Sequence, residues 1–262
     1  MLFRSALLSR RAEISGADAV GLLLSAKPKR RGGDCNMKFR HELKYLINYG
    51  DAELIKQRLR TVLREDSHTI GGKYHIRSLY FDDYFNTAYY DKLDGADGRK
   101  KYRIRLYNLE DNFIRLECKI KSGAYISKLS APVTKAETDK IFEGDYGFLL
   151  SSEHELCRQF YYECVSNVMR PKVYVDYERE PYIMESGDVR ITFDSDVRGA
   201  YPCEGITGEG MVFGYVLDPG KLVMEVSSQN FCLKLYGRYC RQGRWSRVRF
   251  QNMCFAVTPS VR

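Results

Sequence analysis

The sequence predicts an α+β fold in which about eight antiparallel strands close into a β-tunnel around a polar lumen, with flanking helices outside. Several runs alternate polar and apolar residues, as strands with one buried and one wetted face do. In two of these runs, residues 101–107 and 115–121, the polar positions are nearly all cationic. An ordinary surface strand mixes charge signs, so this row of Arg and Lys indicates a wall that holds a polyanion.

The first half of the chain gives three elements before the basic strands. Residues 39–47 alternate, and Arg40, Glu42 and Lys44 share one face. Asp51 is expected to cap a helix whose apolar residues recur at helical spacing. Residues 74–81 form the next strand, followed by a turn at residues 82–83 and a short Tyr-rich segment.

The basic strands are expected to form a hairpin through residues 108–112, after Asp- and Gly-rich turn signals at 94–98. Another short strand follows at 128–133. A capping box at Thr134 and Glu137 then begins a helix, and Ser152 with Glu155 begins a longer one over residues 152–168. Residues 172–179, 189–194 and 221–226 are the remaining strands, whereas 212–217 is ambiguous. The helices number three.

The net charge of +8 is unevenly spread along the chain. Residues 1–36 carry +4 and residues 227–262 carry +7, so the middle of the chain carries −3. A uniformly basic nucleic-acid-binding protein is therefore not indicated. A slightly acidic region that gathers cations on particular strand faces favours an enclosed anion site instead.

The cysteines and the hydropathy pattern place the protein in a broad class. Eight cysteines occur without any CxxC pair and His is scarce, which argues against a zinc site and favours a reduced, cytoplasmic protein. No run of about 18 apolar residues occurs, so no membrane-spanning helix is predicted. If the protein acts at the inner face of a membrane, it needs a separate membrane protein as partner.

The two ends of the chain do not share the strand pattern of the middle. Met37 begins a clean strand pattern, so we expect residues 1–36 to be a non-native or disordered extension and residues 37–226 to form the tunnel domain. Residues 227–262 have no acidic residue and neither helical nor strand periodicity.

The ordered set of motifs in the middle of the chain resembles the VTC domain, the polyphosphate polymerase module of the vacuolar transporter chaperone family within the triphosphate tunnel metalloenzymes. The motifs are Arg40-His41-Glu42-Leu43-Lys44-Tyr45, Ser78-Leu79-Tyr80-Phe81-Asp82, Tyr102-Arg103-Ile104-Arg105, Leu116-Glu117-Cys118-Lys119, Arg170-Pro171-Lys172, Tyr177-Glu178-Arg179, Asp188-Val189-Arg190-Ile191 and Met224-Glu225-Val226. No single motif is specific, but their order and spacing are.

The resemblance implies a tunnel enzyme that transfers the γ-phosphate of ATP onto inorganic polyphosphate with a divalent metal, Mn²⁺ or Mg²⁺. It implies catalytic roles for Lys44, Arg103, Arg105 and Lys119, and phosphate contacts by Lys128, Tyr177, Arg179 and Arg190. Glu225 would hold the metal, with support from Glu42 and Glu117, which share its face in the strand pattern. Phosphoryl transfer needs charge neutralisation and alignment more than covalent help, which such a cationic wall provides.

Some of these side chains also have structural interpretations. Arg190 beside Asp194 could form a structural ion pair, and Arg179 between two Glu residues could lie on the surface. Tyr177 could be core packing. Glu225 on an apolar strand is more telling, because an unpaired buried carboxylate is costly.

The chain departs from the family pattern after Val226. The family has a Lys two residues beyond the Glu, where this chain has Ser227. A one-base shift of reading frame, with suitable codons, restores that Lys and the later family pattern, so we hypothesise that residues 227–262 are out of frame.

Two other functions remain open at this stage. A tunnel triphosphatase would share the scaffold, although such hydrolases tend to carry paired Glu residues before the first-strand Lys, where this chain has Arg40. A non-catalytic polyphosphate-binding domain is favoured if the tail is genuine. The oligomeric state is not predicted.

Overall fold

A computed structural model describes residues 40–228, apart from 67–68, 70, 124, 185–187 and 209. The strands are β1 (His41–Asn48), β2 (Arg64–Glu65), β3 (Tyr74–Asp82), β4 (Arg99–Tyr107), β5 (Glu110–Ser122), β6 (Tyr125–Val133), β7 (Arg170–Met184), β8 (Val189–Ala200), β9 (Gly214–Tyr215) and β10 (Lys221–Ser228). The helices are α2 (Tyr49–Leu59), α3 (Thr87–Asp94), α4 (Lys135–Glu143) and α5 (Glu155–Ser166), with a 3₁₀ turn η1 (Gly147–Ser151).

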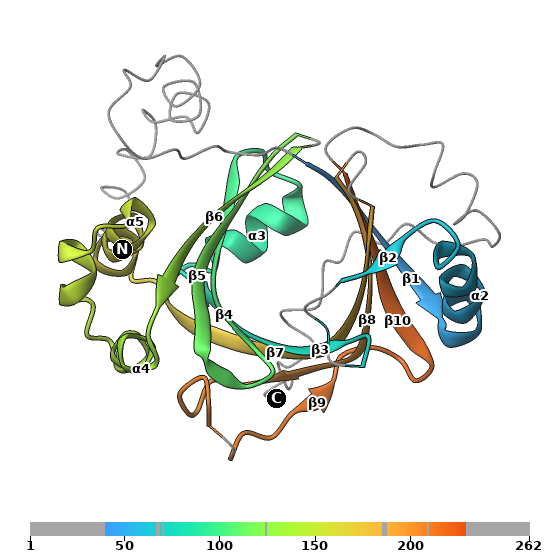
Figure 1. The fold of residues 1–262 in the computed structure, drawn as a ribbon. Helices are drawn as coiled ribbons and strands as arrows, with labels where there is room; N and C mark the ends of the chain where they lie inside the picture. Colours follow the sequence, from blue (N-terminus) through green and yellow to red (C-terminus); the bar gives the residue numbers. More distant parts are fainter. Residues whose placement is uncertain are drawn as a thin grey trace, which may run out of the picture.

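Eight strands form one curled antiparallel sheet in the order β1-β10-β8-β7-β3-β4-β5-β6, with the short β2 and β9 beside β7 and β8. The two edges of this sheet meet at one bridge, where Arg40 and Ile126 exchange backbone hydrogen bonds of 3.0 Å. The α+β tunnel fold with about eight strands is thus confirmed, and Figure 1 shows the curl of the sheet around its concave side.

Most apolar positions of the strands lie on the convex face, where they bury two cores, and a third cluster gathers residues of β3, β7 and β8 such as Ile76, Val175 and Val197. One core joins β1, β8 and β10 to α2 through residues such as Tyr45, Leu59 and Met224. The other joins β4, β5 and β6 to α4 and α5 through residues such as Ile104 and Phe160. Figure 1 shows α2 outside one side of the sheet and α4 with α5 outside the other, which leaves the polar strand positions facing the lumen.

Helix α3 lies on the concave side of the sheet, unlike the other helices (Figure 1), and none of its residues is buried. The sequence analysis left this region as a turn and a Tyr-rich segment, because α3 has no apolar stripe. Its start is fixed by the carboxylates before it: Asp83 accepts from the Thr87 N–H, and Asp82 accepts from the Ala88 and Tyr89 N–H groups. This is capping of orphan helix donors by side chains.

The helix boundaries also differ from those expected in two places. The cap of α2 is Asn48, whose side chain accepts from the Asp51 N–H, so the assignment of Asp51 as the cap was wrong. The capping box at Thr134 and Glu137 is confirmed. The expected helix over 152–168 is shorter, because Ser152 follows η1 and the cap residue of α5 is His154.

The expected extension at residues 1–36 and most of the atypical tail lie outside the described residues. Within the described residues, β10 continues past Val226 to Ser228. No helix in this part of the chain is long and apolar enough to cross a bilayer.

Candidate functional site

The seven cations predicted from the sequence lie on the concave side of the sheet or at its rim, and each has a carboxylate within 4.0 Å. The pairs join Lys44 to Glu225 and Glu42, Arg103, Arg105 and Lys128 to Glu117, Lys119 to Glu42, Arg179 to Asp194 and Glu225, and Arg190 to Asp66. Seven cations therefore meet five carboxylates, and the lumen keeps an excess of positive charge. The predicted row of cations is one connected ionic network rather than a bare basic wall.

Glu117 on β5 is the centre of the first half of this network. Its carboxylate is 2% exposed and accepts from Arg103 at 2.8 Å and from Lys128 at 2.9 Å, with Arg105 at 4.0 Å. Arg103 and Glu117 are directly opposite in the β4–β5 register, which brings their side chains together on one face. Glu117 thus organises cations from the two strands that flank it, β4 and β6.

Glu225 on β10 is the centre of the second half. The Lys44 Nζ lies 2.7 Å from its carboxylate and 3.6 Å from that of Glu42, and Arg179 Nη2 lies at 3.9 Å. Arg179 itself grips Asp194 through two hydrogen bonds of 2.6 and 2.7 Å. Glu225 therefore has cationic partners, and Arg179 is largely buried, which excludes the alternative that it is a surface residue.

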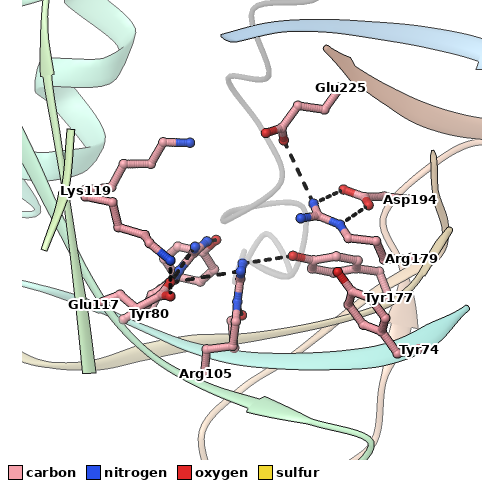
Figure 2. Close-up of polar contacts among 12 residues, drawn as sticks. Tyr74, Tyr80, Arg105, Glu117, Lys119, Tyr177, Arg179, Asp194 and Glu225 are labelled. Atoms are coloured by element: carbon pink, nitrogen blue, oxygen red, sulfur yellow. Dashed lines mark hydrogen bonds and ion pairs between the residues drawn. The ribbon is translucent and has the colours of Figure 1, made fainter. Parts of the chain in front are cut away.

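Tyr177 joins the two halves. Its hydroxyl accepts from Arg105 Nη2 at 2.9 Å, and its ring lies under the Arg179 guanidinium at 5.1 Å from the centroid. Figure 2 shows these side chains and Glu225 directed toward a common space. Burial raises the pKa of Tyr177 despite the nearby arginines, so the phenol stays protonated and keeps an O–H donor for a ligand.

Arg190 has other partners than the one that the sequence suggested. It donates to the Tyr74 hydroxyl at 2.7 Å and to Asp66 at 3.4 Å, whereas Asp194 binds Arg179. The structural alternative considered for Arg190, an ion pair with Asp194, is therefore not what forms. The strand register explains the difference, because Asp194 is directly opposite Arg179 in β7.

The acids and bases of the network keep one another ionised because opposite charges lie close together. Burial alone would raise the pKa of Glu117, but Arg103, Arg105 and Lys128 lower it well below its usual value. Burial opposes ionisation of Glu225 in the same way, and Lys44, Lys119 and Arg179 lower its pKa well below the usual range. Burial would lower the pKa of Lys44, but Glu225 and Glu42 raise it above its ordinary value. All three groups are charged at neutral pH.

The lumen beside Glu225 contains a buried hydroxyl without a partner. Thr192 is 3% exposed and directly opposite Glu225 in the β8–β10 register, and its Oγ1 has no hydrogen-bond partner among the described residues. The Nε of Arg190 is also buried and unpartnered within the described chain. Because buried polar atoms are normally hydrogen-bonded, these two atoms indicate a place for a polar ligand.

The same place suits a hard divalent cation. Glu225 and Glu42 both contact Lys44, and they present anionic oxygen, which Mg²⁺ and Mn²⁺ prefer. Among the described residues, no group of three His, Cys, Asp or Glu side chains could hold a metal ion by itself. The residues therefore fit a cation that takes one or two carboxylates and completes its shell with phosphate oxygens and water. Glu117 is committed to its three cations.

Sequence reasoning missed several residues of the network. Tyr80 accepts from Arg103 Nη1 at 3.0 Å, and Ser78 accepts from Arg105 Nε at 3.3 Å. Tyr74 and Asp66 contact Arg190, and Thr192 lies opposite Glu225. The sequence does show that Ser78 and Tyr80 lie on the same face of their strand as Tyr74, because their positions alternate. The partner of each side chain depends on the register between strands that are distant in sequence.

Comparison with known proteins gives a family match and distant structural likenesses. The VTC domain family matches residues 39–248, which extends beyond Val226. A candidate adenylate cyclase from Bacillus halodurans is similar in structure, with 13% identity, 74% of this chain and 82% of that chain covered and a TM-score of 0.46. A candidate adenylyl cyclase from Hippeastrum, described as having a dominant triphosphatase activity, is also similar. Its sequence is 12% identical, 74% of this chain and 80% of that chain are covered, and the TM-score is 0.44. No curated protein matches the chain.

Proposed function

This chain belongs to the VTC domain family, and on that premise we propose that it transfers the γ-phosphate of ATP onto an inorganic polyphosphate chain bound in the lumen. The observation that carries the proposal is the enclosed network of Lys44, Arg103, Arg105, Lys119 and Arg179 around the buried Glu117 and the partly exposed Glu42 and Glu225. Such a network neutralises several phosphate groups at once and excludes bulk water from them.

Phosphate oxygens would bind by taking over donors that now contact carboxylates. Arg103 and Arg105 offer planar N–H groups that match phosphate oxygens, and Lys44 and Lys119 add point charges. Tyr177 adds a hydroxyl that is already oriented by Arg105. Because seven cations share five carboxylates, a phosphate chain adds negative charge where the lumen lacks it.

The reaction requires little proton transfer from the protein. An oxygen of the terminal phosphate of the acceptor chain forms a bond to the γ-phosphorus of ATP, and the bond to the β-phosphate oxygen breaks, which releases ADP. The acceptor is already ionised at neutral pH, so no general base is needed. A Mn²⁺ or Mg²⁺ held by Glu225, with Glu42 beside it, would supply further neutralisation of the phosphate oxygens.

The proposal is tested with the full chain, γ-labelled ATP, short polyphosphate and Mn²⁺. We expect the label in lengthened polyphosphate, with one ADP formed for each phosphate added. Glu225→Gln should abolish this incorporation, whereas Lys73→Met, which removes an exposed lysine 3.7 Å from Glu178, should leave it unchanged. Label found in orthophosphate alone would contradict the polymerase and identify a triphosphatase.

A non-catalytic polyphosphate-binding domain is the second candidate, and Ser227 favours it. Ser227 lies opposite Glu42 and Arg190 in the sheet, where the family resemblance expects a Lys on the lumen face. A lumen that lacks this charge could bind phosphate chains without turning over ATP. In the same assay this candidate predicts polyphosphate binding with no release of ADP, and resequencing codons 220–262 tests whether Ser227 is genuine.

A further inference from the structure

A second cationic cavity lies beside the network, where β3 ends and α3 and β4 begin. It is a small cavity, partly open to solvent, and it is lined by Tyr80, Asp82, Tyr89, Lys101, Lys172 and Val173 among others. Its two lysines come from β4 and β7, strands that lie on either side of β3. Lys101 belongs to the cationic row of residues 101–107, but neither lysine is among the site residues that the family resemblance implies.

Lys101 and Lys172 differ from the seven cations of the network in having no carboxylate partner among the described residues. Both are half-buried, and neither makes an ion pair or side-chain hydrogen bond within the described part of the chain. The one carboxylate that lines the cavity, Asp82, accepts from the backbone N–H groups of Asp83, Ala88 and Tyr89. The capping of α3 thus uses the acid that could otherwise neutralise the lysines.

Two observations place the cavity next to the network: the position of Lys101 in β4 and a hydrogen bond of Tyr80. Lys101 shares the lumen face of β4 with Arg103 and is directly opposite Lys119, which in turn is opposite Lys128. Tyr80, which lines the cavity, accepts a hydrogen bond from Arg103 Nη1 at 3.0 Å. In this row of three lysines, Lys119 is paired with Glu42 and Lys128 with Glu117, so Lys101 is the one that no described carboxylate neutralises.

We propose that this cavity is a further phosphate subsite, which holds a phosphate group of the polyphosphate chain beyond those bound by Arg103 and Arg105. The inference rests on the proposed function, because it names where the bound chain continues. Two ammonium groups without partners are suited to one phosphate group, since each can donate a charge-assisted hydrogen bond to its oxygens. A longer chain should therefore bind more tightly than one that fills the network alone.

The test compares tripolyphosphate with a longer polyphosphate of defined length, titrated into the full chain by calorimetry at fixed ionic strength. We expect the wild type to bind the longer chain about tenfold more tightly or better. The double variant Lys101→Met/Lys172→Met should lose this gain and keep its affinity for tripolyphosphate. Lys100→Met/Lys135→Met removes the same charge from two exposed lysines outside the cavity and should keep the gain.

Each contrary result has a separate meaning. If the wild type binds both chains equally, or the double variant keeps the gain, the subsite is wrong while the network stands. If the control variant loses as much as the double variant, net charge rather than the cavity explains the gain, which also overturns the subsite. If the wild type binds neither chain, the proposed function fails and the subsite fails with it.

Discussion

The lumen and the convex face of β3, β4 and β7 each hold buried arginines, but these arginines are bound in different ways. On the convex face, Arg77 donates to Asp176 through Nε and Nη2 at 3.0 Å, and its Nη1 donates to the carbonyls of Ile206 and Gly208. In the lumen, the partners of Arg103 and Arg105 are side chains, among them those of Glu117, Tyr80, Ser78 and Tyr177.

The partners of Arg77 are fixed, whereas a ligand could replace the partners of the lumen arginines. Arg77 is covered by the segment that contains Ile206, Gly208 and Phe213, and its guanidinium lies 4.9 Å from the Phe213 ring centroid, so a ligand cannot reach it. A lumen arginine can release a rotatable side chain in favour of a phosphate oxygen. Buried ion pairs of similar length should therefore serve stability on one face and binding on the other.

Removing Arg77 should give the largest loss of stability. Arg77→Met leaves the Asp176 carboxylate buried without its guanidinium, which costs about 3–5 kcal/mol of unfolding free energy. Urea denaturation measures this loss. The matched control is Lys73→Met, which removes an exposed lysine just before β3 and breaks its 3.7 Å pair with Glu178 of β7; it should cost less than about 1 kcal/mol. Equal losses in the two variants would remove the contrast between the faces.

Removing Arg103 should reduce activity strongly and stability only slightly, the opposite of what is expected for Arg77. In Arg103→Met, Glu117 keeps Lys128 and Arg105, so the unfolding free energy should fall by less than in Arg77→Met. The rate of phosphate transfer should fall by about 10²–10³-fold, the usual cost of one donor to developing charge. Denaturation and turnover are measured on the same preparation. A variant that loses stability as Arg77→Met does while keeping its rate would contradict the proposed role.

Replacing Thr192 should separate stability from ligand affinity within the lumen. Thr192→Val keeps the shape of the side chain and removes a buried hydroxyl that has no partner among the described residues, so the unfolding free energy should stay equal or rise. If this hydroxyl binds a ligand beside Glu225, affinity for tripolyphosphate should fall by about tenfold, and Thr192→Ser should retain it. Unchanged affinity in Thr192→Val would remove Thr192 from the site.

Acid should affect stability through the lumen carboxylates only at low pH. The folded pKa values of Glu117 and Glu225 are lowered, so their contribution is fully present above the unfolded value of about 4.3 and is lost as pH falls below it toward the folded values. Between pH 7 and 5 these groups should leave the melting temperature unchanged. Glu117→Gln should flatten the decline below about pH 4.3. A wild-type decline that begins near pH 6, and that Glu117→Gln removes, would oppose this assignment.

The fold and the lumen cations could be predicted because both follow from local alternation. Residues 101–107 and 115–121 place cations on one face of a strand whatever the rest of the chain does. The burial of Leu116 and Ile104 behind them then fixes that face as the lumen.

The ion-pair partners could not be predicted in the same way. Arg179 and Asp194 meet because β7 and β8 pair in one register with a bulge between Asp176 and Glu178, and a shift of that register would have favoured other partners. Helix α3 was missed because its stability comes from capping by Asp82 and Asp83 rather than from an apolar stripe. The cavity of Lys101 and Lys172 depends on that helix, so it was hidden for the same reason.

The most direct measurement of the central claim is the affinity of the full chain for tripolyphosphate in the wild type, in Arg103→Met and in Lys73→Met, by calorimetry at one ionic strength. The account predicts one saturable site in the wild type, an affinity at least about tenfold lower in Arg103→Met, and no change in Lys73→Met. Equal affinities in all three proteins, or no binding in the wild type, would contradict the claim that the lumen cations hold a phosphate chain.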